Sequence, residues 1–269
     1  MKYSIVVVTN RGIDTLRALF LVSHPDAEVI IIDSHYNEER KQELKLIPHG
    51  FKQVVYAPPK KADPVRRFDM MSALNTGYAY AEGEWTMRMD DNAEFKPDFF
   101  QRLEEDIMHF QKLHGNRFIV RQLELEGGCG DVKWTSFIKD IPDRYYRVPP
   151  GVSRGCVPVI TAGIFFSHRD VMFDLNGFDE RYDDGLGWND NDMLFRAVAA
   201  EYMVFYDVQL MIYRAPHVSS GVDVRDVNQQ LFISIFKDKL MAGVYRSENP
   251  FTLQQLHEEL LPQKKEYVI

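Results

Sequence analysis

The feature that most restricts the fold is a regular alternation of apolar, β-rich runs with amphipathic segments over about the first 95 residues. The apolar runs are short and almost uninterrupted, as at residues 3–9 and 27–33. This pattern is typical of strands that are buried on both faces of a parallel sheet. Between these two runs, residues 13–20 carry apolar side chains at helical spacing. We therefore expect an α/β fold with a mostly parallel, Rossmann-like sheet.

Similar patterns continue along the chain, although the second half is less regular. Further strands are expected at residues 52–58, 84–90, 116–125, 158–168, 202–207 and 210–217. Helices are expected at residues 37–47, 67–81 and 98–114, on both sides of a loop within residues 169–201, and from about residue 223 onward. The sequence therefore predicts one large domain, or two closely joined lobes, with a mostly helical tail.

Composition narrows the class of protein. Cys129 and Cys156 are the only two cysteines, too few for a disulfide framework, which favours a reducing, cytoplasmic setting. The first apolar run is too short for a signal sequence. No stretch approaches the roughly 18–20 apolar residues that span a bilayer, so we expect no integral membrane segment. The net charge of −8 argues against broad nucleic-acid binding.

Polar residues follow three of the expected parallel strands. They are Thr9, Asn10 and Arg11 after the first strand, Asp33 after the second, and Asp90, Asp91 and Asn92 after the fourth. In open α/β sheets, ligands bind beyond the carboxyl ends of the strands, so these side chains are expected to meet in one crevice. Each group also has a structural interpretation, as a tight turn or as the cap of the next helix.

The chemistry expected of the crevice is phosphate binding through a cation. The chain has neither the Walker pattern nor G-x-G-x-x-G, which removes the commonest triphosphatase and dinucleotide-binding classes. A divalent cation with hard oxygen ligands can bridge to phosphates instead. Asp90 and Asn92 are the candidate ligands, and His217 after a later strand could complete the shell. Such a mixed set suits manganese as well as magnesium.

A second polar cluster lies in GLGWNDNDMLFRA, residues 185–197. Asn189 or Asp190 can cap the helix that begins there, and Asp192 can pair with Arg196 four residues on. The functional alternative makes Asp190 a general base, because deprotonating a hydroxyl needs a carboxylate within hydrogen-bond reach. Trp188 can stack on a sugar face or anchor the core.

The order and spacing of these motifs resemble the family 2 inverting glycosyltransferases of the GT-A fold. The resemblance runs through residues 4–34, 72–100 and 161–197 and covers most of residues 3–217. It implies a nucleotide-sugar-binding half at residues 1–95 and an acceptor-side, catalytic half of the same domain at residues 96–222. Residues 223–269 would be a helical C-terminal extension.

The family pattern also implies a role for individual positions. The nucleoside and the nucleotide side of the cleft would be contacted by Thr9, Asn10, Arg11, Asp33, Arg67 and Asn75. MDDN matches the family's D-x-D, so Asp90 and Asp91 would contact ribose and metal pyrophosphate, with Mn²⁺ or Mg²⁺ on Asp90, Asn92 and His217. Gly163 and Trp188 would lie beside the donor sugar. Asp190 would be the base and Asp192 an acceptor-side contact.

Two departures from the family pattern matter. Asn92 occupies the last D-x-D position, which lowers the expected metal affinity. Asn189 stands where relatives often carry Glu, which leaves the choice of base between Asp190 and Asp192 open.

The resemblance predicts a metal-dependent inverting glycosyltransferase that moves a sugar from a nucleoside diphosphate sugar, expected to be a UDP-sugar, to an acceptor hydroxyl. A glycan, a lipid-linked sugar, a protein and a modified nucleic acid all remain open as acceptor. A non-catalytic sugar-nucleotide or glycan-binding module is the alternative that Asn92 favours. A sugar-1-phosphate nucleotidyltransferase fits less well, because TNRGID at residues 9–14 is a poor glycine-rich loop.

Overall fold

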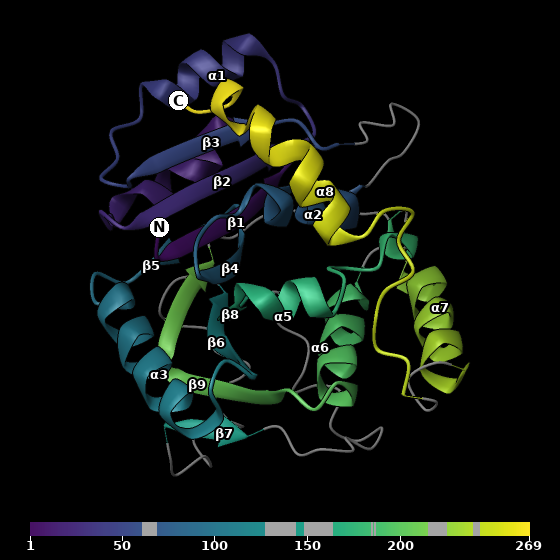
Figure 1. Ribbon diagram of the computed structural model, residues 1–269. Coiled ribbons are helices and arrows are strands. Elements are labelled where there is room, and N and C mark those ends of the chain that lie inside the picture. The colour runs from purple at the N-terminus through teal and green to yellow at the C-terminus, as the bar shows by residue number, and fades with distance from the viewer. Residues whose placement is uncertain are drawn as a thin grey trace.

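The structure is a computed structural model that describes residues 1–60, 69–126, 144–147, 164–183, 185, 187–214, 225–238 and 243–269. Within these residues, one sheet has the strand order β3-β2-β1-β4-β8-β6-β9-β5, and β7 pairs with β9 (Figure 1). The strands are β1 (Tyr3–Thr9), β2 (Ala27–Asp33), β3 (Gln53–Ala57), β4 (Trp85–Asp90), β5 (Ala93–Phe95), β6 (Phe118–Glu126), β7 (Tyr145–Arg147), β8 (Phe165–His168) and β9 (Met203–Arg214). Strands β5, β7 and β8 run against the other six, so the expected mostly parallel α/β sheet is confirmed.

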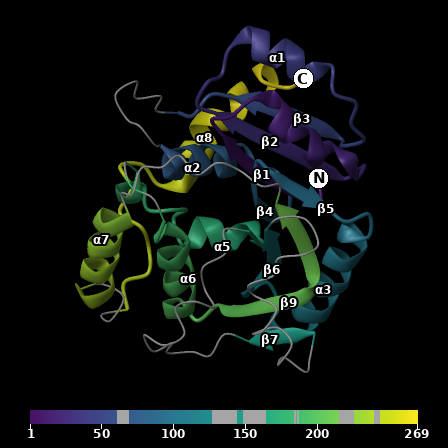
Figure 2. The same ribbon diagram turned by 180° about the vertical axis from the view of Figure 1, so that it is seen from behind.

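Helices cover both faces of the sheet, as Figures 1 and 2 show from opposite sides. On one face lie η1 (Ile13–Leu21), α1 (Glu38–Lys45) and α3 (Phe99–His114). On the other lie α2 (Met70–Tyr80), α5 (Arg169–Asp174), α6 (Asn189–Ala199), α7 (Arg225–Asp238) and α8 (Leu253–Leu260), and the short η3 (Glu180–Tyr182) and η5 (Leu261–Glu266) complete the set. The expected helix near residue 13 is a tighter 3₁₀ helix.

The two faces explain the uninterrupted apolar runs. Successive strand side chains point to opposite faces. In β1, Ile5 and Val7 accordingly enter the core beneath α3, whereas Val6 enters the core beneath α2. All three side chains are fully buried, so this strand presents apolar residues to both faces of the sheet.

Helix α2 takes its N-terminal cap from a distant loop. Asp69 at its N-cap position makes no capping hydrogen bond. Instead the Asp183 carboxylate accepts hydrogen bonds from the amides of Met71 (2.6 Å) and Ser72 (3.2 Å). Burial raises the pKa of Asp183 to about 6, although these donors favour its ionised form. The loop before α6 is therefore fastened to the start of α2.

The end of the chain packs against the nucleotide-sugar-binding half that was predicted for residues 1–95. Helix α8 lies across α2 (Figure 1), and Val268 forms an antiparallel bridge with Val55 at the edge of the sheet. The ammonium group of Lys264 contacts Oε2 of Glu28 (2.5 Å) and Oε2 of Glu82 (2.6 Å). The predicted tail is helical, but its last residues also extend the sheet.

A buried charge cluster fastens β7, which lies beside β9 (Figure 2). The Arg144 guanidinium donates to Asp106 of α3 at 2.9 Å and to Asp207 of β9 at 3.0 Å. Both carboxylates are fully buried. Burial and the neighbouring Asp207 raise the pKa of Asp106.

Among the described residues, no helix combines the length and apolarity needed to cross a membrane.

Candidate functional site

The carboxyl ends of β2, β1 and β4 bring the predicted polar residues to one edge of the sheet. Thr9 pairs in register with Asp33, and Val8 pairs with Asp90. Asn10 follows directly and is exposed. The ends of these separate stretches therefore lie side by side at one edge of the sheet.

Asp91 ties the end of β4 to the end of β1. Its Oδ2 accepts a hydrogen bond from the Thr9 hydroxyl at 2.8 Å, and its Oδ1 accepts one from Nη1 of Arg11 at 3.0 Å. The Arg11 amide also donates to the Thr9 hydroxyl oxygen. Asp91 is buried and both of its oxygens are engaged, so it shapes the loop and is poorly placed to bind a cation.

Asp33 lies in a ring of donors that the sequence did not reveal. Its Oδ2 accepts hydrogen bonds from Nε and Nη2 of Arg40 (2.8 and 2.6 Å) and from the Tyr56 hydroxyl (2.6 Å). The amide of His35 donates to Oδ1 at 2.8 Å. Burial, with Asp33 beside it, raises the pKa of Tyr56, so this hydroxyl stays a donor. Nη2 of Arg40 also donates to the Arg11 carbonyl, which joins the first two loops.

Arg88 joins the fourth strand to helix α6. Its Nη1 forms an ion pair with Oδ1 of Asp190, and its Nη2 lies 3.9 Å from Oδ1 of Asp90. The guanidinium carbon is 5.6 Å from the centre of the Phe178 ring, and Arg88 is only 2% exposed. The two carboxylates remain partly exposed, at 15% for Asp90 and 19% for Asp190. A buried cation therefore connects the predicted donor carboxylate to the predicted base.

Asp192 is paired with an arginine of its own helix. Its Oδ2 accepts from Nε of Arg196 at 2.8 Å, and Arg196 also donates to the carbonyls of Leu175 and Gly177. Asp192 is fully buried, and burial raises its pKa against the lowering effect of Arg196. This geometry disfavours Asp192 as an acceptor-side contact and matches the pairing alternative, except that the pair is buried rather than on the surface.

The start of α6 differs from the prediction. Neither Asn189 nor Asp190 is the cap, because both are already helical. Trp188 occupies the cap position with a left-handed φ of 66°, and its ring packs on Phe232 of α7 with centroids 5.2 Å apart. Trp188 therefore anchors α7, which favours its structural interpretation.

Asn75 serves the loop that follows α5. Its Oδ1 accepts from the Phe178 amide (2.8 Å), and its Nδ2 donates to the Phe178 carbonyl (2.9 Å). Asn75 is buried, and this geometry gives it a structural contact. The predicted positions Arg67, Gly163 and His217 lie outside the described residues.

The residues present fit a cation that a diphosphate helps to bind. Among the described residues, no three histidine, cysteine or acidic side chains gather closely enough to hold a metal by themselves. Asp90, however, offers a partly exposed carboxylate at the strand end. Magnesium is usually bound through one or two carboxylates together with substrate phosphates, and manganese accepts the same hard ligands.

Comparison with known proteins finds one matching family model, which covers less than half of the chain. Residues 5–126 match the family model described as "Glycosyl transferase family 2". No curated protein matches the chain.

The similar solved structures have the GT-A fold. S. aureus TarS 1-349 has a TM-score of 0.58 at 15% identity, covering 80% of this chain and 60% of that one. The same protein in complex with UDP-GlcNAc has a TM-score of 0.63 at 13% identity, covering 98% and 72%. GalNAc-T7 with UDP, GalNAc and Mn²⁺ has a TM-score of 0.61 at 14% identity, covering 99% and 54%. At these identities the likeness establishes the fold alone.

Proposed function

We propose that this chain, a glycosyltransferase with the GT-A fold, moves a sugar from a UDP-sugar to an acceptor hydroxyl with inversion. One observation carries the proposal: the carboxylates of Asp90 and Asp190 lie next to the two terminal nitrogens of one buried guanidinium, that of Arg88. Binding a diphosphate and deprotonating an acceptor are different tasks, and an inverting transfer needs both groups at one centre. TarS with UDP-GlcNAc and GalNAc-T7 with UDP support UDP as the nucleotide.

The donor would bind along the ends of β1, β2 and β4. Asp33, oriented by Arg40 and Tyr56, is proposed to contact the nucleoside. Asp90 would hold Mn²⁺ or Mg²⁺ jointly with the diphosphate, with Asn92 and His217 as the further proposed ligands. The cation supplies charge stabilisation to the departing diphosphate. Arg11, held by Asp91, adds positive charge at the same edge.

Asp190 is proposed as the base, in preference to Asp192. Its Oδ1 accepts from Arg88 and from Nδ2 of Asn189 at 3.1 Å. Its Oδ2 is the oxygen proposed to accept the acceptor's proton. The acceptor oxygen then attacks the anomeric carbon from the face opposite the departing diphosphate. Its bond to the sugar forms as the bond to the diphosphate breaks, and no covalent sugar–enzyme intermediate is required.

The test is release of UDP from UDP-GlcNAc and UDP-GalNAc, measured with and without manganese. Water is the acceptor in this assay, so the natural acceptor need not be known. Asp90→Ala should abolish release. Asp190→Asn should lower kcat by about 10²–10⁴-fold, the usual range for a general base, while UDP binding persists.

Asp192→Asn is the comparison variant, two residues further along the same helix. It should lower the thermal midpoint, and it should lower kcat less than Asp190→Asn does, because Asp192 is paired inside the protein. If Asp192→Asn alone stops release, the base is assigned to the wrong residue. Tight UDP binding with no release from any donor would instead establish the binding-module alternative.

A further inference from the structure

We propose that Arg88 is a positioning residue, which fixes the base Asp190 beside the donor-binding carboxylate Asp90. The inference rests on the proposed function and concerns a residue that no sequence motif singles out. Arg88 lies within β4, two residues before Asp90, whereas Asp190 is in the first turn of α6, 102 residues away. A single guanidinium therefore spans the strand that ends at the donor site and the helix that carries the base.

The position of Arg88 in the sheet determines where its charge goes. It pairs in register with Val6 of β1 and with Phe165 of β8. Both neighbours belong to the core between the sheet and α2, so the side chain must leave the sheet on that face. The aliphatic stem is surrounded by this core and the guanidinium lies over the Phe178 ring. Little freedom remains, so the guanidinium is presented to α6 in a fixed orientation.

A purely structural role does not explain this arrangement well. Burying a cation beneath a helix costs free energy that apolar residues would avoid, and replacement of buried ion pairs by apolar residues is often neutral or stabilising. The Arg88 pair instead uses one carboxylate oxygen, Oδ1 of Asp190, and this carboxylate stays partly exposed, while the same guanidinium lies 3.9 Å from Asp90 at the strand end. A planar guanidinium fixes the orientation of a carboxylate better than an ammonium does. The pair therefore determines which oxygen of Asp190 faces the acceptor.

The experiment is a double-mutant cycle on Arg88 and Asp190. It follows UDP release from UDP-GlcNAc and UDP-GalNAc, with UDP affinity measured separately by calorimetry. Arg88→Met should lower kcat by about 10–100-fold, the usual effect of removing a residue that orients a reacting group, and should change UDP affinity by less than about threefold. Arg88→Lys should recover part of kcat, because lysine restores the positive charge but not the planar arrangement of guanidinium donors. The double variant should be no slower than Asp190→Asn alone, because Arg88 acts through Asp190.

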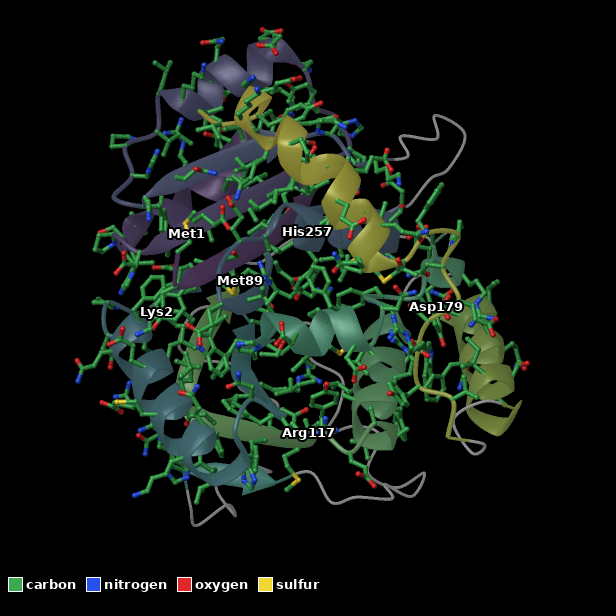
Figure 3. All side chains as sticks on the ribbon, in the orientation of Figure 1. Met1, Lys2, Met89, Arg117, Asp179 and His257 are labelled. Atoms are coloured by element: carbon green, nitrogen blue, oxygen red, sulfur yellow. The ribbon has the colours of Figure 1, made fainter. Side chains whose placement is uncertain are left out.

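Arg117→Met is the control for loss of an arginine. Arg117 directly precedes β6, and its side chain donates a hydrogen bond to the Ala200 carbonyl. Figure 3 shows Arg117 well away from Met89, which lies near the end of β4. This variant should leave kcat and UDP affinity unchanged. Each variant is checked for its thermal midpoint, so that a loss of folded protein is not counted as a loss of kcat.

Two results would overturn the inference. If the fold losses of kcat in the two single variants multiply in the double variant, Arg88 does not act through Asp190. A loss confined to UDP affinity would make Arg88 a donor-binding residue. A wild-type protein that binds UDP but releases none from either donor contradicts the proposed function itself, which is a different outcome from a failed cycle.

Discussion

Replacing Lys264 with methionine is expected to lower the free energy of unfolding by about 3 kcal/mol, because it leaves a buried carboxylate without its cation. Glu28 is fully buried and Lys264 is 4% exposed, so water cannot replace the lost contact. Removing one partner of a buried pair typically costs about 3–5 kcal/mol. The lower end applies here, because Oε1 of Glu28 keeps its hydrogen bonds from the Ser4 hydroxyl (2.6 Å) and the Glu82 amide (2.9 Å).

Urea unfolding followed by circular dichroism measures this loss. Lys265→Met is the matched control: it removes the same charge from the next residue, which is exposed, and should change stability by less than about 0.5 kcal/mol. Adding Glu28→Gln to Lys264→Met should recover part of the loss, because an amide is cheaper to bury than a lone carboxylate. If Lys264→Met lowers the free energy of unfolding no more than Lys265→Met does, Lys264 does not stabilise the buried charge of Glu28 and the reasoning is refuted.

Two further predictions concern Asp183 and Arg40. Burial raises the pKa of Asp183 to about 6, above about 3.9 in an unfolded chain, so the folded state binds this proton more tightly. Its contribution to stability is therefore most favourable below pH 4 and declines as pH rises to 6, by about 3 kcal/mol in total. Asp183→Asn should remove this decline from urea unfolding curves between pH 4 and 7, and an unchanged decline would assign it to other groups. Arg40→Met removes two hydrogen bonds to Asp33 and should weaken UDP binding about tenfold, as measured by calorimetry. Unchanged UDP affinity would mean that Asp33 does not contact the nucleoside.

The parts of the fold that the sequence predicted are those that depend on local pattern. The second strand was expected at residues 27–33 and is β2 (Ala27–Asp33), because a fully buried strand leaves a continuous apolar run. The convergence of Asp33 and Asp90 could also be predicted, since parallel strands place their carboxyl ends at one edge. Such inferences need the order of the strands but no contact between distant side chains.

The parts that could not be predicted depend on contacts between distant segments. Arg88 looks like an ordinary polar residue in a strand until α6 brings Asp190 to it. Tyr56 looks like an apolar strand residue, although its hydroxyl reaches Asp33 on the neighbouring strand. The sequence pattern leaves the choice of base between Asp190 and Asp192 open. Only the packing of α6 exposes the first and buries the second beside Arg196.

The adjacent carboxylates at the end of β4 are tolerated because each has its own arginine. Arg11 forms an ion pair with Asp91, and Arg88 lies between Asp90 and Asp190. The carboxylates of Asp90 and Asp190 stay partly exposed beside their shared arginine, at the edge where a diphosphate would bind. Exposed carboxylates repel a bare diphosphate, whereas a divalent cation bound to them reverses the sign of the local charge. These carboxylates therefore give a reason for manganese to strengthen UDP binding even though the D-x-D-like segment ends in an amide, Asn92.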